Sequence, residues 1–132
     1  MTAAVDLRLP PGPESVPRAR RALDPLAGKV DPSVLDRARL MVSELVTNAI
    51  RHAGLGPDDR ISLRVSVVGG SLRTEVRDAG PGFTPGRRPI TIYQQSGWGL
   101  YLVAQLADRW GVTKDGDVCV WFEIDGLGAE GL

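Results

Sequence analysis

The sequence of 132 residues has the length of one domain, and its 42% hydrophobic residues suffice for a single core. Sixteen basic residues balance sixteen acidic residues, so the chain lacks the positive footprint of a nucleic-acid-binding protein. A single cysteine excludes an internal disulfide and a cysteine zinc site, and no apolar run is long enough for a signal peptide or a membrane span. We therefore expect one cytoplasmic domain, residues 1–132, without direct contact to nucleic acid or membrane.

The N-terminal segment predicts a strand followed by an amphipathic helix. Apolar and charged residues alternate over residues 5–9, and Pro10 to Pro13 end this strand. A helix is expected from about Glu14 to Gly28, with apolar residues at helical spacing on one side. The other side carries three arginines, Arg18, Arg20 and Arg21. By itself, this pattern favours a solvated face.

The clearest element is a long helix over about residues 32–53. Asp31 can cap it, Pro32 suits its first position and Gly54 can end it. Its broad apolar arc predicts packing on a sheet. Two alternating segments follow, residues 61–67 and 72–78, joined by a glycine pair that is typical of a hairpin.

The second half of the chain predicts a lid, a helix and two closing strands. Residues 79–99 are rich in Gly, Pro, Arg and Gln, which is typical of a functional loop. A helix follows over about residues 100–107, then strands at 110–112 and 118–124, and a frayed tail at about 125–132. The expected fold is an α/β two-layer sandwich with about three helices on one face of a mixed, mostly antiparallel sheet.

Glu44 and Asn48 form the first of three polar patches. They lie one turn apart at the edge of the apolar arc of the long helix, so their side chains are neighbours. A carboxylate there can act as a general base, and an amide oxygen can bind Mg²⁺. The alternative is a pair of ordinary surface residues.

The second patch begins with Asp78 at the end of a predicted strand. Gly80 and Gly82 follow at once, and glycines allow a ligand to approach the backbone closely. The patch is therefore either one wall of a ligand site or a tight turn.

The third patch is Gly97-Trp98-Gly99, just before the last predicted helix. Free N–H groups and the helix dipole favour a phosphate there, although a simple connecting loop gives the same pattern. Arg87 and Arg88, in the candidate lid, either reach phosphates or are solvated.

Together the three patches resemble the N, G1 and G2 boxes of the GHKL ATPase superfamily. The matching segments are residues 40–53, 76–83 and 97–112, and the similarity extends to residues 120–123 near the end of the chain. In detail the sequence is most similar to the bacterial anti-sigma-factor serine/threonine kinases. The resemblance implies a Bergerat-type ATP-binding fold, with ATP and Mg²⁺ as ligands.

The resemblance also implies roles for individual residues. Glu44 would be the catalytic base, Asn48 the Mg²⁺ ligand, and Asp78 the acceptor for the adenine amino group. Residues 83–96 would form the ATP lid. The remaining positions that would line the nucleotide pocket are His52, Gly80, Gly82, Ser96, Gly97, Trp98, Gly99 and Leu100.

Two single residues refine this comparison. Members of the family commonly have Thr just before the Val-Trp-Phe run, where its hydroxyl supports the adenine-binding Asp, and we align Cys119 with that position. A thiol is a weaker hydrogen-bond partner, which predicts reduced nucleotide affinity. His52 is the only histidine, and no separate dimerisation helix carries a phosphoacceptor, so we exclude a self-phosphorylating histidine kinase.

The sequence therefore predicts a protein kinase that transfers the γ-phosphoryl group of ATP to a Ser of an antagonist protein and also binds a sigma factor. A binding module that sequesters a partner without catalysis, with or without nucleotide, is the alternative, motivated by Cys119. The severed ATPase domain of a larger machine is a third reading, which the presence of all three boxes without a transducer segment disfavours. The resemblance makes the basic side of the first helix a candidate surface for partner contact or dimerisation, and the sequence leaves a homodimer open.

Overall fold

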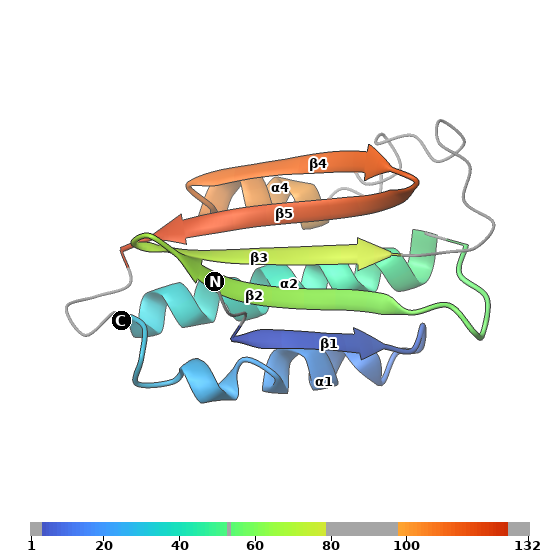
Figure 1. Ribbon diagram of the computed structural model, residues 1–132, viewed down its shortest axis with the longest axis horizontal. Coiled ribbons are helices and arrows are strands. Elements are labelled where there is room, and N and C mark those ends of the chain that lie inside the picture. Colours follow the sequence, from blue (N-terminus) through green and yellow to red (C-terminus); the bar gives the residue numbers. More distant parts are fainter. Residues whose placement is uncertain (1–3, 53, 79–97, 127–132) are drawn as a thin grey trace.

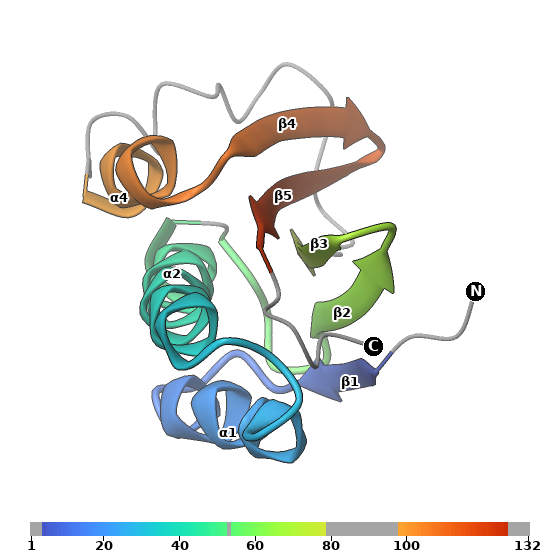
Figure 2. The same cartoon turned by 90° about the vertical axis from the view of Figure 1, so that its left-hand side faces the viewer.

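The computed structural model describes residues 4–52, 54–78 and 98–126, which form two layers (Figures 1 and 2). One layer is a five-stranded sheet in the order β1-β2-β3-β5-β4. Its strands are β1 (Val5–Leu9), β2 (Ile61–Val68), β3 (Ser71–Asp78), β4 (Arg109–Asp115) and β5 (Asp117–Asp125). The other layer holds α1 (Ser15–Arg21), the 3₁₀ helix η1 (Asp24–Leu26), α2 (Pro32–His52) and α4 (Trp98–Leu106).

The predicted two-layer α/β sandwich is confirmed. The described helices lie on one face of the sheet, which Figure 2 shows from the end. Every strand pairing in the described sheet is antiparallel, so the parallel component that a mixed sheet would contain is not seen there. The β2–β3 hairpin turns at Gly69-Gly70 as expected, and Gly69 has the positive φ of 62° that favours glycine.

The predicted end of the first helix and the predicted start of the tail were wrong. The first helix ends at Arg21 and a separate 3₁₀ turn follows, because Pro25 has no N–H to continue the helical hydrogen bonds. Asp125, which we assigned to a frayed tail, is the last residue of β5 and pairs with Ser71 of β3. The rest of that tail, residues 127–132, lies outside the described residues.

The core lies between α2 and the inner face of the sheet. The Asp31 carboxylate caps α2 as predicted, accepting hydrogen bonds from the Ser33 N–H at 2.8 Å and the Ser33 hydroxyl at 2.9 Å. These hydrogen bonds, the one from the Ser33 backbone N–H above all, lower the pKa of Asp31. The buried α2 side chains facing the core include Met41, Val42, Leu45 and Val46. None of the described helices has the length and hydropathy needed to cross a membrane.

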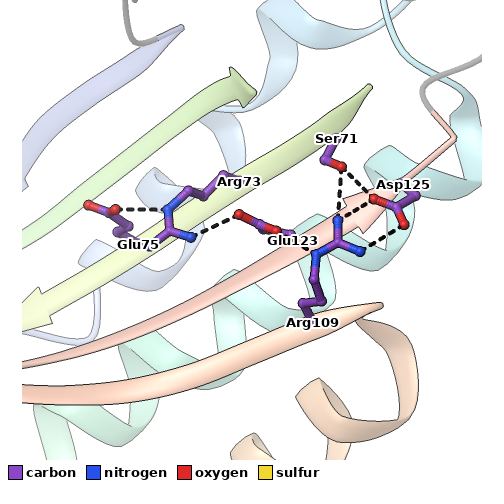
Figure 3. Close-up of polar contacts among 6 residues, drawn as sticks. All are labelled: Ser71, Arg73, Glu75, Arg109, Glu123 and Asp125. Atoms are coloured by element: carbon purple, nitrogen blue, oxygen red, sulfur yellow. Dashed lines mark hydrogen bonds and ion pairs between the residues drawn. The ribbon is translucent and has the colours of Figure 1, made fainter. Parts of the chain in front are cut away.

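The outer face of the sheet is uncovered by the described helices and carries a network of charged residues (Figure 3). Arg73 of β3 donates to Glu75 at 3.0 Å and to Glu123 of β5 at 2.9 Å. Arg109 of β4 donates to Glu123 at 2.7 Å and to Asp125 at 3.1 Å. The network thus ties three neighbouring strands together on a solvated surface.

Trp121 lies within this polar face, against the backbone of β4. The Arg73 guanidinium stacks 4.4 Å from the centroid of its ring. A Cβ atom at Gly111 would stand 2.8 Å from the indole Nε1, so glycine at this position leaves room for the ring.

The network predicts a pH-dependent contribution to stability from Asp125. Its hydrogen bonds with Arg109 lower the pKa of Asp125 from 3.8 to about 2. Because the pKa is lower in the folded state, the stabilisation is complete above pH 3.8 and is lost as the pH falls towards 2. We expect Asp125→Asn to unfold at lower urea concentration than wild type at pH 7, with the difference shrinking between about pH 4 and pH 2.

The control is Asp6→Asn, a substitution of an exposed residue on the outer face of β1 that makes no ion pair within the described part of the chain. It should leave the urea midpoint nearly unchanged at both pH values. An Asp125→Asn difference as large at pH 2 as at pH 7 would contradict the account.

Candidate functional site

The C-terminal half of α2 carries the first predicted patch. Asn48 is buried with 6% of its surface exposed, and Glu44, one turn earlier, is half-buried. The neighbouring hydroxyls of Ser43 and Thr47 donate to backbone carbonyls four residues earlier, at 2.9 Å and 2.7 Å. These two hydroxyls are therefore bonded within α2 itself.

The Asn48 amide carries a buried donor without a partner. Among the described residues, Nδ2 of Asn48 and Oγ1 of Thr74 are the buried side-chain polar atoms that make no hydrogen bond. Burial of such an atom is costly, and in a native protein it calls for a physical reason. Thr74 is fully buried opposite Phe122 in the middle of the sheet, whereas Asn48 lies near the end of α2. A ligand that accepts a hydrogen bond at this end would satisfy the Asn48 amide.

Asp78 ends β3 and is 2% exposed, so its carboxylate is buried where the strand stops. Figure 1 shows that this end of β3, the C-terminal end of α2 and the N-terminal end of α4 all lie towards the same end of the molecule. The fold thus brings the backbone positions of the three patches to one end. The described polar groups there include the Glu44 and Asp78 carboxylates, the unpartnered Asn48 amide, and the buried Asp59, which accepts a hydrogen bond from the Gly56 N–H at 2.7 Å.

The helix α4 begins at Trp98, two residues earlier than the predicted start at Leu100. Trp98 and Gly99 therefore belong to the first turn of the helix and do not precede it. The N–H groups of a first turn have no partner within the helix, which makes this end suited to an anionic ligand.

Part of the predicted site lies outside the described residues. This holds for the lid at residues 83–96, including Arg87 and Arg88, and for Gly80, Gly82, Ser96 and Gly97. Only the backbone is described at His52, the last residue of α2, and at Trp98, Gly99 and Leu100 in α4. The roles assigned to these residues stay predictions.

The expected role of Cys119 was wrong, because its side chain is on the other face of the sheet from Asp78. Side chains alternate along a strand, and the β3–β5 register pairs Asp78 with Val118 and Cys119 with Arg77. Cys119 belongs with Thr113 and Arg77 on the outer face, where burial raises the pKa of its thiol.

Val118 is the residue of β5 that pairs with Asp78, and sequence reasoning missed it. The apolar series Val118, Val120, Phe122 and Ile124 marks the inner face of β5, and this alternation could have identified it from the sequence. An apolar side chain, 1% exposed, therefore stands across from the Asp78 carboxylate.

Comparison with known protein families agrees with this arrangement. Residues 9–124 match the model of the histidine kinase-like ATPase domain. The chain belongs to this family. The membership predicted from the N, G1 and G2 boxes is thereby confirmed.

Individual relatives are similar along most of the chain. The serine-protein kinase RsbW of Staphylococcus epidermidis is 28% identical over 131 residues, covering 88% of this chain and 82% of the relative. RsbW of Listeria monocytogenes is 29% identical over 118 residues, covering 79% of this chain and 75% of the relative. The solved catalytic domain of histidine kinase ThkA superposes on this chain with a TM-score of 0.52 and 16% sequence identity. The match covers 95% of this chain and 97% of the ThkA chain, which shows a shared fold.

The unpartnered Asn48 amide predicts a substitution that stabilises the ligand-free protein. Asn48→Leu replaces the amide by an apolar group of similar size, and we expect the free energy of unfolding to rise by about 1 kcal/mol. Thr74→Val removes the other unpartnered atom in the interior of the sheet and should act in the same direction. Urea unfolding without nucleotide measures both. A loss of stability in Asn48→Leu would show that the amide is hydrogen-bonded in the folded protein.

Proposed function

We propose that this protein is an ATP-dependent serine/threonine protein kinase. The observation that carries the proposal is the buried, unpartnered Asn48 amide, one turn from Glu44 and at the end of the molecule where β3 stops at Asp78. Membership in the histidine kinase-like ATPase family and similarity to two serine-protein kinases support ATP as the phosphoryl donor and serine as the acceptor.

The described residues fit an adenine nucleotide with Mg²⁺. Asp78 is a buried acceptor for the adenine amino group, which favours adenine over guanine because guanine has a carbonyl in that position. The Asn48 amide would bind Mg²⁺ through its oxygen, and its unpartnered Nδ2 would donate to a phosphate oxygen. Mg²⁺ prefers oxygen ligands and commonly uses few protein groups together with substrate phosphates. The first turn of α4 would face the phosphates with its N–H groups.

Glu44 is the proposed general base. Its half-buried carboxylate would accept the proton of the serine hydroxyl as the hydroxyl oxygen bonds to the γ-phosphorus and the bond to ADP breaks. ATP supplies the phosphoryl group, and Mg²⁺ neutralises charge on its phosphates when bound. The protein contributes mainly position, because phosphoryl transfer needs little covalent chemistry from the enzyme.

The proposed partners are a sigma factor and an antagonist protein. The basic side of α1 is the candidate surface for these partners or for a second copy of the chain. Arg18, Arg20 and Arg21 are all exposed. A hollow of about 350 Å³ lies beside them, lined by Pro17, Arg20, Arg21, Asp24 and Arg39. Since Asp24 is already paired with Arg39 at 2.6 Å, the other arginines are available to an acidic partner surface.

The kinase proposal predicts the effects of two substitutions on phosphotransfer. Glu44→Gln should lower the transfer rate by about 100-fold or more, because it removes the base and keeps the shape. Asn48→Ala should weaken Mg²⁺-dependent ATP binding and transfer together. The measurement is transfer from labelled ATP to an antagonist protein that co-purifies with the chain.

Asp36→Asn, an exposed change on the same helix, is the control and should transfer at the wild-type rate. Unchanged transfer in both Glu44→Gln and Asn48→Ala would contradict the site assignment.

A binding module that sequesters its partner without catalysis is the second candidate. Val118 favours it, because the residue across from Asp78 offers no hydroxyl to support nucleotide binding. Stable partner binding together with no phosphotransfer from ATP and Mg²⁺ would favour this candidate over the kinase.

The register of β5 predicts that nucleotide affinity responds to residue 118 and not to residue 119. Val118→Thr places a hydroxyl beside Asp78, and we expect the dissociation constant for ATP to fall about threefold to tenfold, the effect of one added hydrogen bond. Cys119→Thr makes the matched change on the outer face and should leave the constant unchanged. Calorimetric titration measures both, and tighter binding by Cys119→Thr alone would contradict the account.

A further inference from the structure

The helix α4 has a narrow apolar contact with the rest of the fold. Of its side chains described from Tyr101 to Leu106, Val103 is the one that is fully buried. Tyr101 is 55% exposed, and Ala104 and Gln105 are also exposed. Because few apolar side chains hold α4 in place, we expect polar contacts at its ends to contribute more to its position than in a deeply packed helix.

Arg37 of α2 makes such a contact at the C-terminal end of α4. Its guanidinium Nη1 donates to the backbone carbonyl of Leu106, the last residue of α4, at 3.2 Å. Its Nε donates to the Ser33 carbonyl within α2, also at 3.2 Å, so the planar group is held from both sides. The last carbonyls of a helix lack partners in the helix and carry the negative end of its dipole. A positive donor at this point fixes α4 against α2.

The two helices run side by side in opposite directions (Figures 1 and 2). Arg37 and Leu106 meet at one end, so the first turn of α4 lies further towards the end of α2 that carries Asn48. Asn48 is eleven residues beyond Arg37, about 16 Å along the helix at 1.5 Å per residue. A shift of α4 along α2 would therefore change the distance between the first turn of α4 and the Glu44–Asn48 pair.

We propose that Arg37 is a positioning residue that sets the register of α4 against α2 and thereby the geometry of the nucleotide site. The proposal rests on the proposed function for its effect on ATP. Its structural part is independent of ATP, because the contact joins two helices of the protein itself.

The first experiment measures hydrogen exchange of the α4 amides without nucleotide. Arg37→Met keeps the apolar stem and removes both donors, and we expect the α4 amides to exchange about twofold to fivefold faster, the effect of losing a charged donor at a helix terminus. Arg64→Met is the matched control, because Arg64 is exposed on the outer face of β2, on the side of the sheet away from the helices. Unchanged exchange of α4 in Arg37→Met would overturn the proposal.

The second experiment measures the KM for ATP and kcat with the same variants. Arg37→Met should raise KM by about twofold to fivefold, whereas Arg64→Met should leave KM unchanged. Arg37→Lys should restore most of the loss because an ammonium can still donate to the Leu106 carbonyl. Equal effects of Arg37→Met and Arg37→Lys would overturn the positioning role. Absence of ATP binding by the wild type would overturn the proposed function, whereas the exchange experiment would still decide the structural part.

Discussion

The packing of α2 flat on the inner face of the antiparallel sheet determines the rest of the structure. Its apolar arc is fully buried from Ala38 to Val46, and burial of each large aliphatic side chain contributes about 1.5–3 kcal/mol. This packing fixes both the rotation and the direction of α2. Residues at the edge of the arc must therefore lie at the rim of the helix layer, and residues near its end must lie near the end of β3. Glu44 and Asn48 occupy that position because of where the apolar residues are, and their burial follows from the same constraint.

The alternation of side chains across the sheet separates two chemistries that are neighbours in the sequence. Inward residues of β3 and β5 are apolar except for Thr74 and the terminal Asp78, whereas outward residues form the charged network of Figure 3. Each arginine in that network is shared between carboxylates, so ion pairs connect the strands on this face, which the described helices leave uncovered. Neighbouring residues of β5 therefore point to opposite faces of the sheet. Val118 is on the inner face beside Asp78, whereas Cys119 is on the outer face.

The sequence allowed prediction of the elements whose signals are local and strong. The cap at Asp31, the arc of α2 and the alternation of β2 and β3 gave the layers and the strand pairing, since each depends on residues close together in the chain. Predictions failed where a single residue decided the outcome. Pro25 determined where the first helix ends, and the register at Cys119 determined the face of the sheet on which its side chain lies. The hydrogen bond from Arg37 to the carbonyl of Leu106 could not be predicted, because it joins a side chain to a backbone atom 69 residues away.

We propose that the buried Asp78 carboxylate at the end of β3 and the unpartnered Asn48 amide of α2 form an adenine nucleotide site. Calorimetric titration of the wild-type protein with ATP and with GTP, each with Mg²⁺, tests this claim most directly. We expect one nucleotide bound per chain and an affinity for ATP at least about tenfold higher than for GTP, the effect of one hydrogen bond to a buried charged group. No detectable binding of ATP at millimolar concentration, or equal affinity for the two nucleotides, would contradict it.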